Sequence, residues 1–561
     1  MITEPKNGIV DWHSIEWDKV SKTVRKLRQR IYRAVQCGEW KQVRNLQKLM
    51  LRSLSNTLLS VRRVTQENQG KDTPGIDGIK SLNPGQKVNL INELMAHQPY
   101  KVKPTKRVYI PKSNGKKRPL GIPVIKDRAM QAVVKNALEP EWEANFEANS
   151  YGFRPGRGCH DAIEQCHNRL REGADRWILD ADIKGAVDNI SHKFLLGKVE
   201  NTPGIELIKQ WLKAGHIEQE VFHNTESGTP QGGVISPLLA NIAFDGMDSI
   251  LSQFKKVKVS KKLEGTRQRK FNKYGFIRYA DDFVITAEVK EDLEAVIPII
   301  ENWLAHRGLT LSKEKTQIVN IEQGFDFLGF NVRQFKGQCL IKPSKEKMKL
   351  LLGKVREWLN SHKTAKPEVV INHLNPLLRG WGNYYRHGVS KEVFSYIDHE
   401  IFKALWRWAK RRHPRKGKRW IKAKYFKTVG NQNWTFAEIV NGRREGEKKL
   451  ISLTKLSEIQ ITRHIKVKDT ASPDDPSLSE YWGKRKTTEG KTYWSKGSSY
   501  YFVAVNQNWK CPACREHLIN GEKLHTHHIV GVKDGGGDEI DNLIHLHKSC
   551  HISLHNKNVT Q

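Results

Sequence analysis

Apolar residues at helical spacing dominate the first 60 residues. Between residues 14 and 60 they recur every three or four positions, as at Val20, Val24, Leu27, Ile31 and Val35. This spacing predicts amphipathic helices. The other faces are basic and carry Lys22, Arg25, Lys26, Arg28, Arg30 and Arg33. Such faces suit either plain exposure to solvent or contact with RNA, and the pattern leaves both interpretations open.

The pattern changes twice further along the chain. From about residue 105 to 335, short strand-like runs alternate with helical ones, which is typical of an α+β domain. From 345 to 412 the pattern is helical again, and one buried stripe is expected at Leu351, Leu352, Val355, Trp358 and Leu359. Residues 465–497 are polar and predict a linker or a loosely folded connection. A chain of 561 residues is too long for one core, so several domains are expected.

Charge indicates the kind of partner. The formal net charge is +36, and lysine and arginine neutralise phosphates, so nucleic acid is the leading candidate. A membrane surface is the alternative, but no run of 18 apolar residues exists and residues 1–5 lack the apolar segment of a signal peptide. We therefore expect a soluble intracellular protein with no membrane partner.

A basic tract between Lys403 and Lys427 contains twelve lysines and arginines and no acidic residue. Aromatic residues are interleaved with them, namely Trp406, Trp408, Trp420, Tyr425 and Phe426. The mixture suits phosphate contact together with stacking on bases or sugars. A small tryptophan-rich core with a charged surface is the alternative, and both interpretations can hold at once.

Two acidic segments suggest a catalytic centre. Apolar runs on either side of Asp281 and Asp282 predict a hairpin with an acidic tip, although such a turn alone is more often a solvated loop. A second apolar run ends in Asp180 and Asp182, which period two places on one face. Two-metal phosphoryl transfer needs carboxylates from two strands. Asp182, Asp281 and Asp282 are the expected ligands of Mg²⁺, or of Mn²⁺.

Segments around these aspartates suit a nucleotide triphosphate. The glycines of 228–233 allow a close approach of the backbone, and Gln231 is expected to hydrogen-bond the template or incoming nucleotide. Residues 108–123 predict a hairpin with cations near its tip. Lys112 and Arg118 are the expected triphosphate contacts.

Cysteines and histidines crowd into the last 51 residues. Two pairs with two intervening residues predict a tetrahedral structural zinc site, with the ligands Cys511, Cys514, His547 and Cys550. His551 and His555 share a helix face, so that a second divalent ion is expected between His527, His551 and His555. One larger structural zinc cluster is the alternative, and His525 and His545 stay unassigned. Four scattered cysteines are expected to be reduced thiols, namely Cys37, Cys159, Cys166 and Cys339.

In this order the motifs resemble those of group II intron reverse transcriptases. The matching segments are 110–112, 118–123, 150–155, 179–185, 229–233, 279–282, 311–316 and 327–330, and 378–385 resembles the maturase signature. The histidine-rich end resembles an HNH nuclease finger. The resemblance implies an α+β multidomain fold, with a right-hand polymerase of fingers, palm and helical thumb and a C-terminal ββα-metal HNH module. It also implies that His528 is the general base, that Asn542 braces the nuclease loop, and that Lys315 donates a proton to pyrophosphate.

By the same resemblance the chain divides into five parts. These are an N-terminal helical extension with the start of the fingers (1–95), fingers and palm (96–340), a helical thumb or maturase domain (341–415), a basic DNA-binding region with a linker (416–497), and a zinc-containing HNH domain (498–561). One residue departs from the family pattern. Five residues after Asp182 the family has an aromatic residue under the sugar, whereas this chain has Val187, which predicts weaker exclusion of ribonucleotides or reduced activity.

The implied function is a multifunctional intron-encoded protein. It would be an RNA-directed DNA polymerase, a maturase that assists intron RNA splicing, and a site-specific DNA endonuclease, supporting intron mobility (retrohoming) by target-primed reverse transcription. The expected partners are group II intron RNA, double-stranded target DNA and deoxynucleoside triphosphates. The expected location is a nucleoid-associated ribonucleoprotein in the bacterial cytoplasm. Two alternatives remain, namely a splicing maturase with impaired polymerase and a domesticated reverse transcriptase without an intron partner.

Overall fold

Helices form the N-terminal part of the chain, as the periodicity predicts. The computed structural model describes residues 11–558 except 112–114, 116, 230, 263–264, 442–447 and 495. Its first elements are α1 (Trp17–Gln36), α2 (Trp40–Arg52), α3 (Leu54–Arg62), a π-helical turn (Arg63–Glu67), a 3₁₀ turn (Gln69–Asp72) and α4 (Pro84–Met95). α1, α2 and α3 all pack against the long helix α5 (Ile125–Asn145). The apolar stripe of α1 is buried along its length, from Val20 to Val35.

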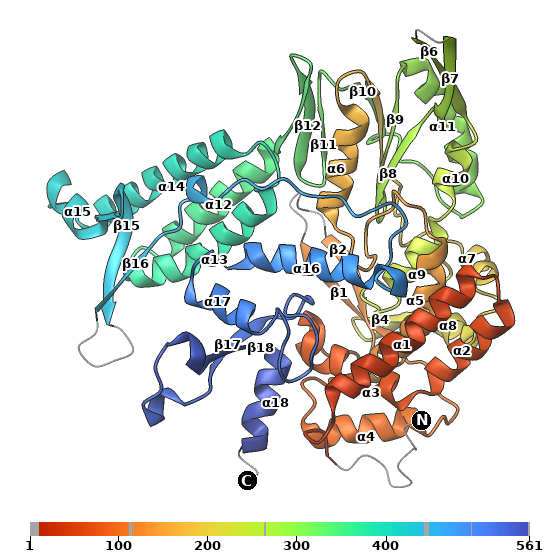
Figure 1. The fold of residues 1–561 in the computed structure, drawn as a ribbon, viewed down its shortest axis with the longest axis horizontal. Coiled ribbons are helices and arrows are strands. Elements are labelled where there is room, and N and C mark those ends of the chain that lie inside the picture. The colour runs from red at the N-terminus through yellow and green to blue at the C-terminus, as the bar shows by residue number, and fades with distance from the viewer. Residues whose placement is uncertain are drawn as a thin grey trace.

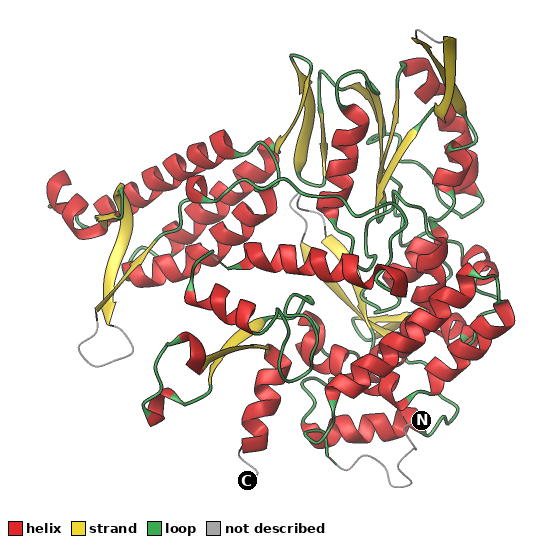
Figure 2. Cartoon of the chain, viewed as in Figure 1, coloured by secondary structure: helices red, strands yellow, loops and turns green. Residues whose placement is uncertain are grey.

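Two four-stranded sheets follow (Figures 1 and 2). The first has the order β2-β1-β4-β5, with β1 (Thr105–Pro111), β2 (Lys117–Ile122), β4 (His216–Glu218) and β5 (Val221–His223). The second, here called the central sheet, has the order β10-β3-β9-β8, with β3 (Trp177–Ala181), β8 (Gly275–Tyr279), β9 (Asp282–Ala287) and β10 (Gln317–Asn320). All neighbouring strands of the central sheet are antiparallel.

The central sheet is buried on both faces, so its strands read as continuous apolar runs. Ile178, Ile277 and Val284 join a core on one face, while Leu179 and Phe276 join a second core on the other. The surrounding elements are α6 (Cys159–Leu170), α7 (His192–Lys198), α8 (Ile205–Leu212), α9 (Ser236–Ala243), α10 (Met247–Leu251), the hairpin of β6 (Lys255–Lys262) and β7 (Gly265–Asn272), and α11 (Lys290–Ala305).

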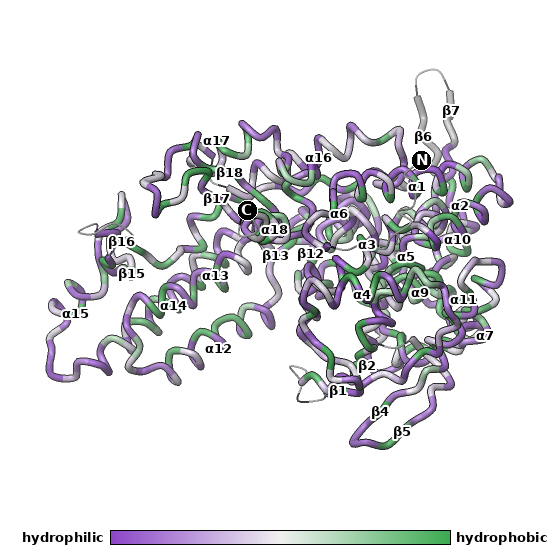
Figure 3. Tube along the Cα trace, turned by 90° about the horizontal axis from the view of Figure 1, so that it is seen from below, coloured by the Kyte–Doolittle hydropathy of each residue, from purple (hydrophilic) through white to green (hydrophobic). Residues whose placement is uncertain are grey.

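A second helical region extends from the central sheet (Figure 1). It begins with a sheet of β11 (Phe325–Phe327), β12 (Phe330–Phe335) and β13 (Gln338–Pro343). It continues with α12 (Lys345–Ser361), α13 (Pro367–Tyr385), α14 (Lys391–Arg412), α15 (Lys418–Tyr425) and a sheet of β14 (Phe426–Val429), β15 (Gln432–Asn441) and β16 (Lys448–Ser452). Hydrophilic and hydrophobic stretches alternate along α12 and α14 (Figure 3), and the predicted stripe of α12 is buried except for the half-buried Trp358.

Most aromatic residues of the basic tract form a small core. Trp408, Tyr425 and Phe426 are buried, and Trp406 packs against them in part. Trp420 keeps 37% of its surface exposed, with the amines of Lys416 and Lys424 over its ring. The prediction of a small tryptophan-rich core therefore accounts for most of these rings. Trp420 is one ring that stays available for stacking.

The prediction of a loose linker at residues 465–497 is wrong for most of that segment. Residues 453–478, here called the strap, cross back over the molecule from the α14 side toward α1 (Figure 1), and α16 (Ser479–Tyr493) follows. Trp482 is buried with Val467 and Ala471, and its indole donates a hydrogen bond to the carbonyl of Ser472 at 2.8 Å. A polar composition predicted weak packing, but one tryptophan and contacts to distant segments suffice to order this region.

The C-terminal part is a hairpin with flanking helices. Its elements are α17 (Ser499–Asn506), β17 (Leu524–His528), β18 (Leu543–His547) and α18 (Lys548–Asn558). Trp509, Leu518 and Leu546 share one core with Trp17 and Leu58 of the N-terminal helices. Among the described residues, no helix has the length and apolar character needed to span a lipid bilayer.

Candidate catalytic and metal-binding sites

Three of the predicted aspartates lie at neighbouring strand ends of the central sheet. β8 and β9 form the expected hairpin, in which Tyr279 pairs with Asp282 and Ala280 adopts a positive φ of 58°. Asp182 follows β3 directly, and β3 pairs with β9. Burial, followed by repulsion from Asp281 and Asp182, raises the pKa of Asp282 to about 6. A divalent cation would relieve this repulsion, so the donor set suits a hard metal ion.

A lysine supplies positive charge at the same place. The amine of Lys315 donates a hydrogen bond to Asp182 Oδ2 at 2.8 Å, and this bond raises the pKa of Lys315. In the described part of the chain, two groups of side chains have potential metal-ligand atoms within 4.8 Å of one another, and both groups lie in the C-terminal region. The aspartates are more widely spaced, so an ion there would have to draw their carboxylates together.

The acidic turn rests on a buried arginine that the motif analysis did not single out. Arg278 of β8 donates hydrogen bonds to Asn241 Oδ1 and to the carbonyl of Ala280, each at 3.1 Å. Asn241 in turn donates to the carbonyl of Gly152 at 2.8 Å. Gly152 lies so close to Ala280 that a Cβ there would meet its backbone nitrogen at 2.3 Å. A charged residue inside an apolar strand is the sequence signal that could have identified this support.

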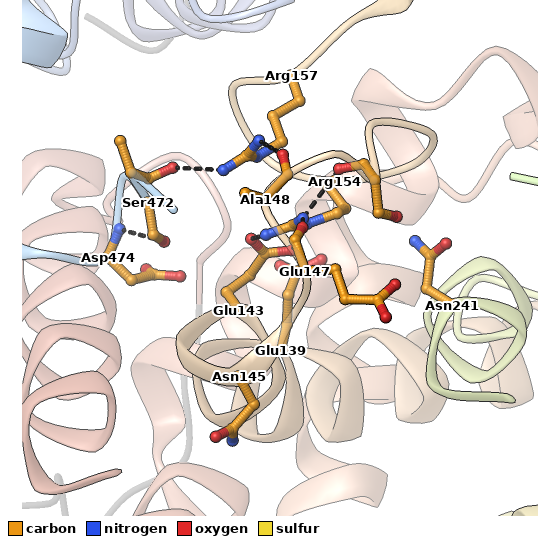
Figure 4. Close-up of polar contacts among 12 residues, drawn as sticks. Glu139, Glu143, Asn145, Glu147, Ala148, Arg154, Arg157, Asn241, Ser472 and Asp474 are labelled. Atoms are coloured by element: carbon orange, nitrogen blue, oxygen red, sulfur yellow. Dashed lines mark hydrogen bonds and ion pairs between the residues drawn. The ribbon is translucent and has the colours of Figure 1, made fainter. Parts of the chain in front are cut away.

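The loop that carries Gly152 is itself anchored by buried arginines (Figure 4). Arg154 and Glu143 form an ion pair at 2.9 Å with 1% of each side chain exposed, and Arg154 also donates to the carbonyl of Ser150 at 2.9 Å. Arg157 donates to carbonyls of the strap, at Asp469 and Ala471. Loop, strap and α5 therefore support the acidic turn together.

Two of the residues predicted to contact the nucleotide, Arg118 and Gln231, lie against each other. Arg118 Nε donates to Gln231 Oε1 at 2.8 Å, and Gln231 Nε2 donates to Asp188 Oδ1 at 2.8 Å. Half-buried Val187 precedes Asp188, and its carbonyl accepts a hydrogen bond from the backbone of Thr229 at 2.9 Å. Asp188 was not among the expected site residues, because nothing in its local sequence marks it. Lys112 lies outside the described residues.

The structure brings the four predicted zinc ligands together. Cys511, Cys514, His547 and Cys550 are all buried, with ligand atoms within 4.8 Å of one another. Hydrogen bonds from the neighbouring sulfurs lower the pKa of Cys511. Soft sulfur and imidazole donors at this spacing fit a tetrahedral Zn²⁺ ion, which would stabilise the thiolate forms.

A second group lies on α18 and β17. His527, His551 and His555 also converge to within 4.8 Å, and the Nε2 atoms of His551 and His555 lie 3.2 Å apart. Burial, followed by the neighbouring imidazoles, lowers the pKa of His551 to about 4. The ring is therefore neutral at neutral pH, the form that binds a metal ion.

His528 and Asn542 sit beside this second group. His528 Nε2 lies 2.8 Å from Asp538 Oδ1, which can orient the ring. Asn542 Oδ1 accepts a hydrogen bond from the backbone of Val530 at 2.7 Å, and its amide donates to the carbonyl of Gly537 at 2.8 Å. Asn542 thus closes the loop between β17 and β18.

The two unassigned histidines have structural surroundings. His545 is fully buried, stacks on Trp494 and lies 2.7 Å from the carbonyl of Tyr500. His525 packs its ring 5.1 Å from that of His551.

Four family models match the chain in succession. They describe the N-terminal domain of reverse transcriptase (residues 12–94), reverse transcriptase, an RNA-dependent DNA polymerase (110–332), the group II intron maturase-specific domain (348–426) and the HNH endonuclease (511–557). Protein YkfC of Escherichia coli is 34% identical, over 48% of this chain and 79% of that protein. The group II intron-encoded protein LtrA of Lactococcus lactis is also 34% identical, over 51% of this chain and 57% of its own length.

More distant relatives are found as well. A putative COX1/OXI3 intron 1 protein of Saccharomyces cerevisiae is 28% identical over 50% of this chain and 39% of that protein. A solved structure of telomerase from Candida albicans aligns with 58% of this chain and 64% of that chain at 13% identity, with a TM-score of 0.32, which is too low to bear on the fold.

Proposed function

Because the chain belongs to the group II intron-encoded reverse transcriptases with maturase and HNH endonuclease domains, we propose that its domains act in sequence on one mobile intron. These domains make it a multifunctional group II intron protein. The maturase and reverse transcriptase domains would bind the intron RNA and assist splicing. The HNH domain would nick target DNA, and the polymerase would extend the new 3′ end with deoxynucleotides, copying the RNA.

The polymerase would have the right-hand arrangement. In this proposal the central sheet is the palm, the sheet of β1 and β2 with the N-terminal helices forms the fingers, and α12–α14 form the thumb. The five-part division proposed from the sequence, at 1–95, 96–340, 341–415, 416–497 and 498–561, is kept as part of this proposal, with the segment before the HNH domain ordered as the strap and α16. A bacterial ribonucleoprotein in the cytoplasm, associated with the nucleoid, is the proposed setting.

The observation that best supports polymerase chemistry is that three aspartates lie at adjoining strand ends. Asp182, Asp281 and Asp282 would hold two Mg²⁺ ions, which when bound would activate the primer hydroxyl and neutralise the triphosphate. Lys315, whose amine donates a hydrogen bond to Asp182, would donate a proton to the leaving pyrophosphate. Arg118, with Gln231, Val187 and Lys112, would orient the incoming nucleotide and its phosphates.

The nuclease chemistry would use the two C-terminal ligand groups differently. Zn²⁺ held by three cysteines and His547 would be structural, because no ligand position is left open. The ion held by His527, His551 and His555 would polarise the scissile phosphate. His528, oriented by Asp538, would take the proton from the attacking water, and Asn542 would hold the loop in register.

Two single substitutions test this assignment and control for each other. Asp281→Ala should abolish extension of a primer on RNA while nicking of target DNA continues. His528→Ala should abolish nicking while extension of a pre-annealed primer continues. The assignment of two separate active sites would be wrong if either variant lost both activities with its fold intact. It would also be wrong if Asp281→Ala still extended the primer or if His528→Ala still nicked the DNA.

Val187 favours one second candidate, a splicing maturase with impaired polymerase. A small side chain in place of the family's aromatic residue would loosen the sugar pocket. Normal stimulation of intron splicing by a wild-type protein that cannot extend a primer would establish this alternative. Efficient extension would remove it. A domesticated polymerase without an intron partner is distinguished by the absence of a folded intron around the coding sequence.

A further inference from the structure

A cavity of about 810 Å³ lies where three distant segments meet. One wall is the turn after α3, with Arg63 and Lys71, and a second is the glycine pair 232–233 that follows Gln231. The third wall belongs to the C-terminal region, at Lys523 and at Lys548 of α18. α18 also carries two of the three nuclease histidines. The cavity is thus lined by chain neighbours of Gln231 on one side and of His551 on the other.

The cavity has an excess of positive charge. Its unpaired cations are Arg63, Lys71, Lys87, Lys523 and Lys548, none of which has a salt-bridge partner among the described residues. The acidic side chains that line it are already engaged. Glu67 and Glu522 both pair with Arg62, at 3.0 and 3.5 Å, and Asp72 accepts a hydrogen bond from Ser81.

Burial and the nearby Lys71 lower the pKa of Lys87. Burial is the larger cause, and repulsion between the two cations adds to it. A phosphate between them would restore the balance of charge, because lysine amines bind phosphates as point charges.

The walls of the cavity are held together by the shared core. Arg62 is 96% buried, lies over the ring of Trp17 at 4.6 Å and donates to Ser549 Oγ at 2.5 Å. Its guanidinium is also 3.7 Å from Cys550 Sγ. The C-terminal region is therefore docked firmly on the N-terminal helices, so the cavity between them has a defined shape.

We propose that this cavity, here called the seam cavity, binds the phosphodiester backbone of single-stranded DNA. The strand would be the one cut at the HNH site, on its path toward the polymerase site, so the inference rests on the proposed function. A volume of about 810 Å³ admits a few nucleotides.

Salt dependence gives a direct test. The double variant Lys71→Glu with Lys523→Glu alters two walls and leaves every proposed catalytic and metal-ligating residue in place. Lys213→Glu with Lys270→Glu makes the same change of charge at exposed positions outside the cavity. Binding of a short labelled single-stranded DNA is measured by fluorescence anisotropy over a range of salt concentrations, with a matching RNA in parallel.

The seam variant should lower the slope of log affinity against log salt by ~2, since each lost phosphate contact removes about one unit. The control should keep the wild-type slope. Nicking alone and extension of a pre-annealed primer should both match the wild type, while extension from the nick should fall. Equal salt slopes for DNA binding in the seam variant and the control, or a loss of binding confined to the RNA, would overturn the proposal. Failure of nicking or extension in the wild type would instead count against the proposed function.

Discussion

Gly152→Ala tests whether the acidic turn depends on the loop packed beneath it. A Cβ at Gly152 would lie 2.3 Å from the nitrogen of Ala280, 2.9 Å from the carbonyl carbon of Tyr279 and 3.0 Å from the Cα of Ala280. All three atoms are backbone of the turn, so no flexible side chain can move aside. Gly152 has an ordinary negative φ, which alanine also adopts, and the effect of the substitution is therefore steric.

The distances set the size of the effect. The shortest contact falls about 1 Å short of the 3.4–4 Å of ordinary van der Waals contact, so the turn must shift by a comparable amount. Overpacking of this kind costs ~1–3 kcal/mol of stability. A misplacement of ~1 Å at reacting groups lowers rates by ~10²-fold. We expect extension to fall by about this factor while the protein stays folded.

Single-nucleotide incorporation and thermal unfolding are the measurements, and Gly158→Ala is the matched control. Gly158 belongs to the same loop region, and a Cβ there meets nothing within 4 Å. The control should retain the wild-type rate. If Gly152→Ala incorporated nucleotides as fast as the control, the packing of this loop would not position the turn. If nicking fell in parallel with incorporation, general unfolding would explain the result instead.

Three further predictions concern other parts of the chain. Val187→Phe should lower the ratio of ribonucleotide to deoxynucleotide incorporation, and ordinary sugar selectivity in the wild-type enzyme would contradict it. Cys514→Ser should reduce bound zinc and lower the melting temperature, because this thiol lies in the core shared with the N-terminal helices; an unchanged zinc content refutes it. Burial raises the pKa of Asp127 to about 6, so folding takes up a proton and stability falls as pH rises from about 4 through 6. Asp127→Asn should remove this dependence, and its unfolding free energy relative to wild type should rise by up to ~3 kcal/mol across that window, whereas a constant difference excludes the effect.

Local patterns predicted the elements well where the pattern itself decides the structure. The hairpin at Asp281 and Asp282 follows from two apolar strands, and the histidine and cysteine groups follow from ligand spacing. The sequence did not reveal that α16 packs against the loop of Gly156 through Trp482, or that Asp188 holds Gln231. Both contacts join segments far apart in the chain, and no periodicity encodes them.

The ion pair between Arg28 of α1 and Asp474 of the strap has a consequence for synthesis of the protein. The two residues are 446 positions apart, and their contact is 2.6 Å. A ribosome adding ~5–20 residues per second needs ~20–90 s to reach the second partner after making the first. During that interval the apolar and charged surfaces of α1 that the strap and C-terminal core will cover face water. Truncated chains that end before the strap keep these surfaces exposed, and they should aggregate more readily than the full-length protein.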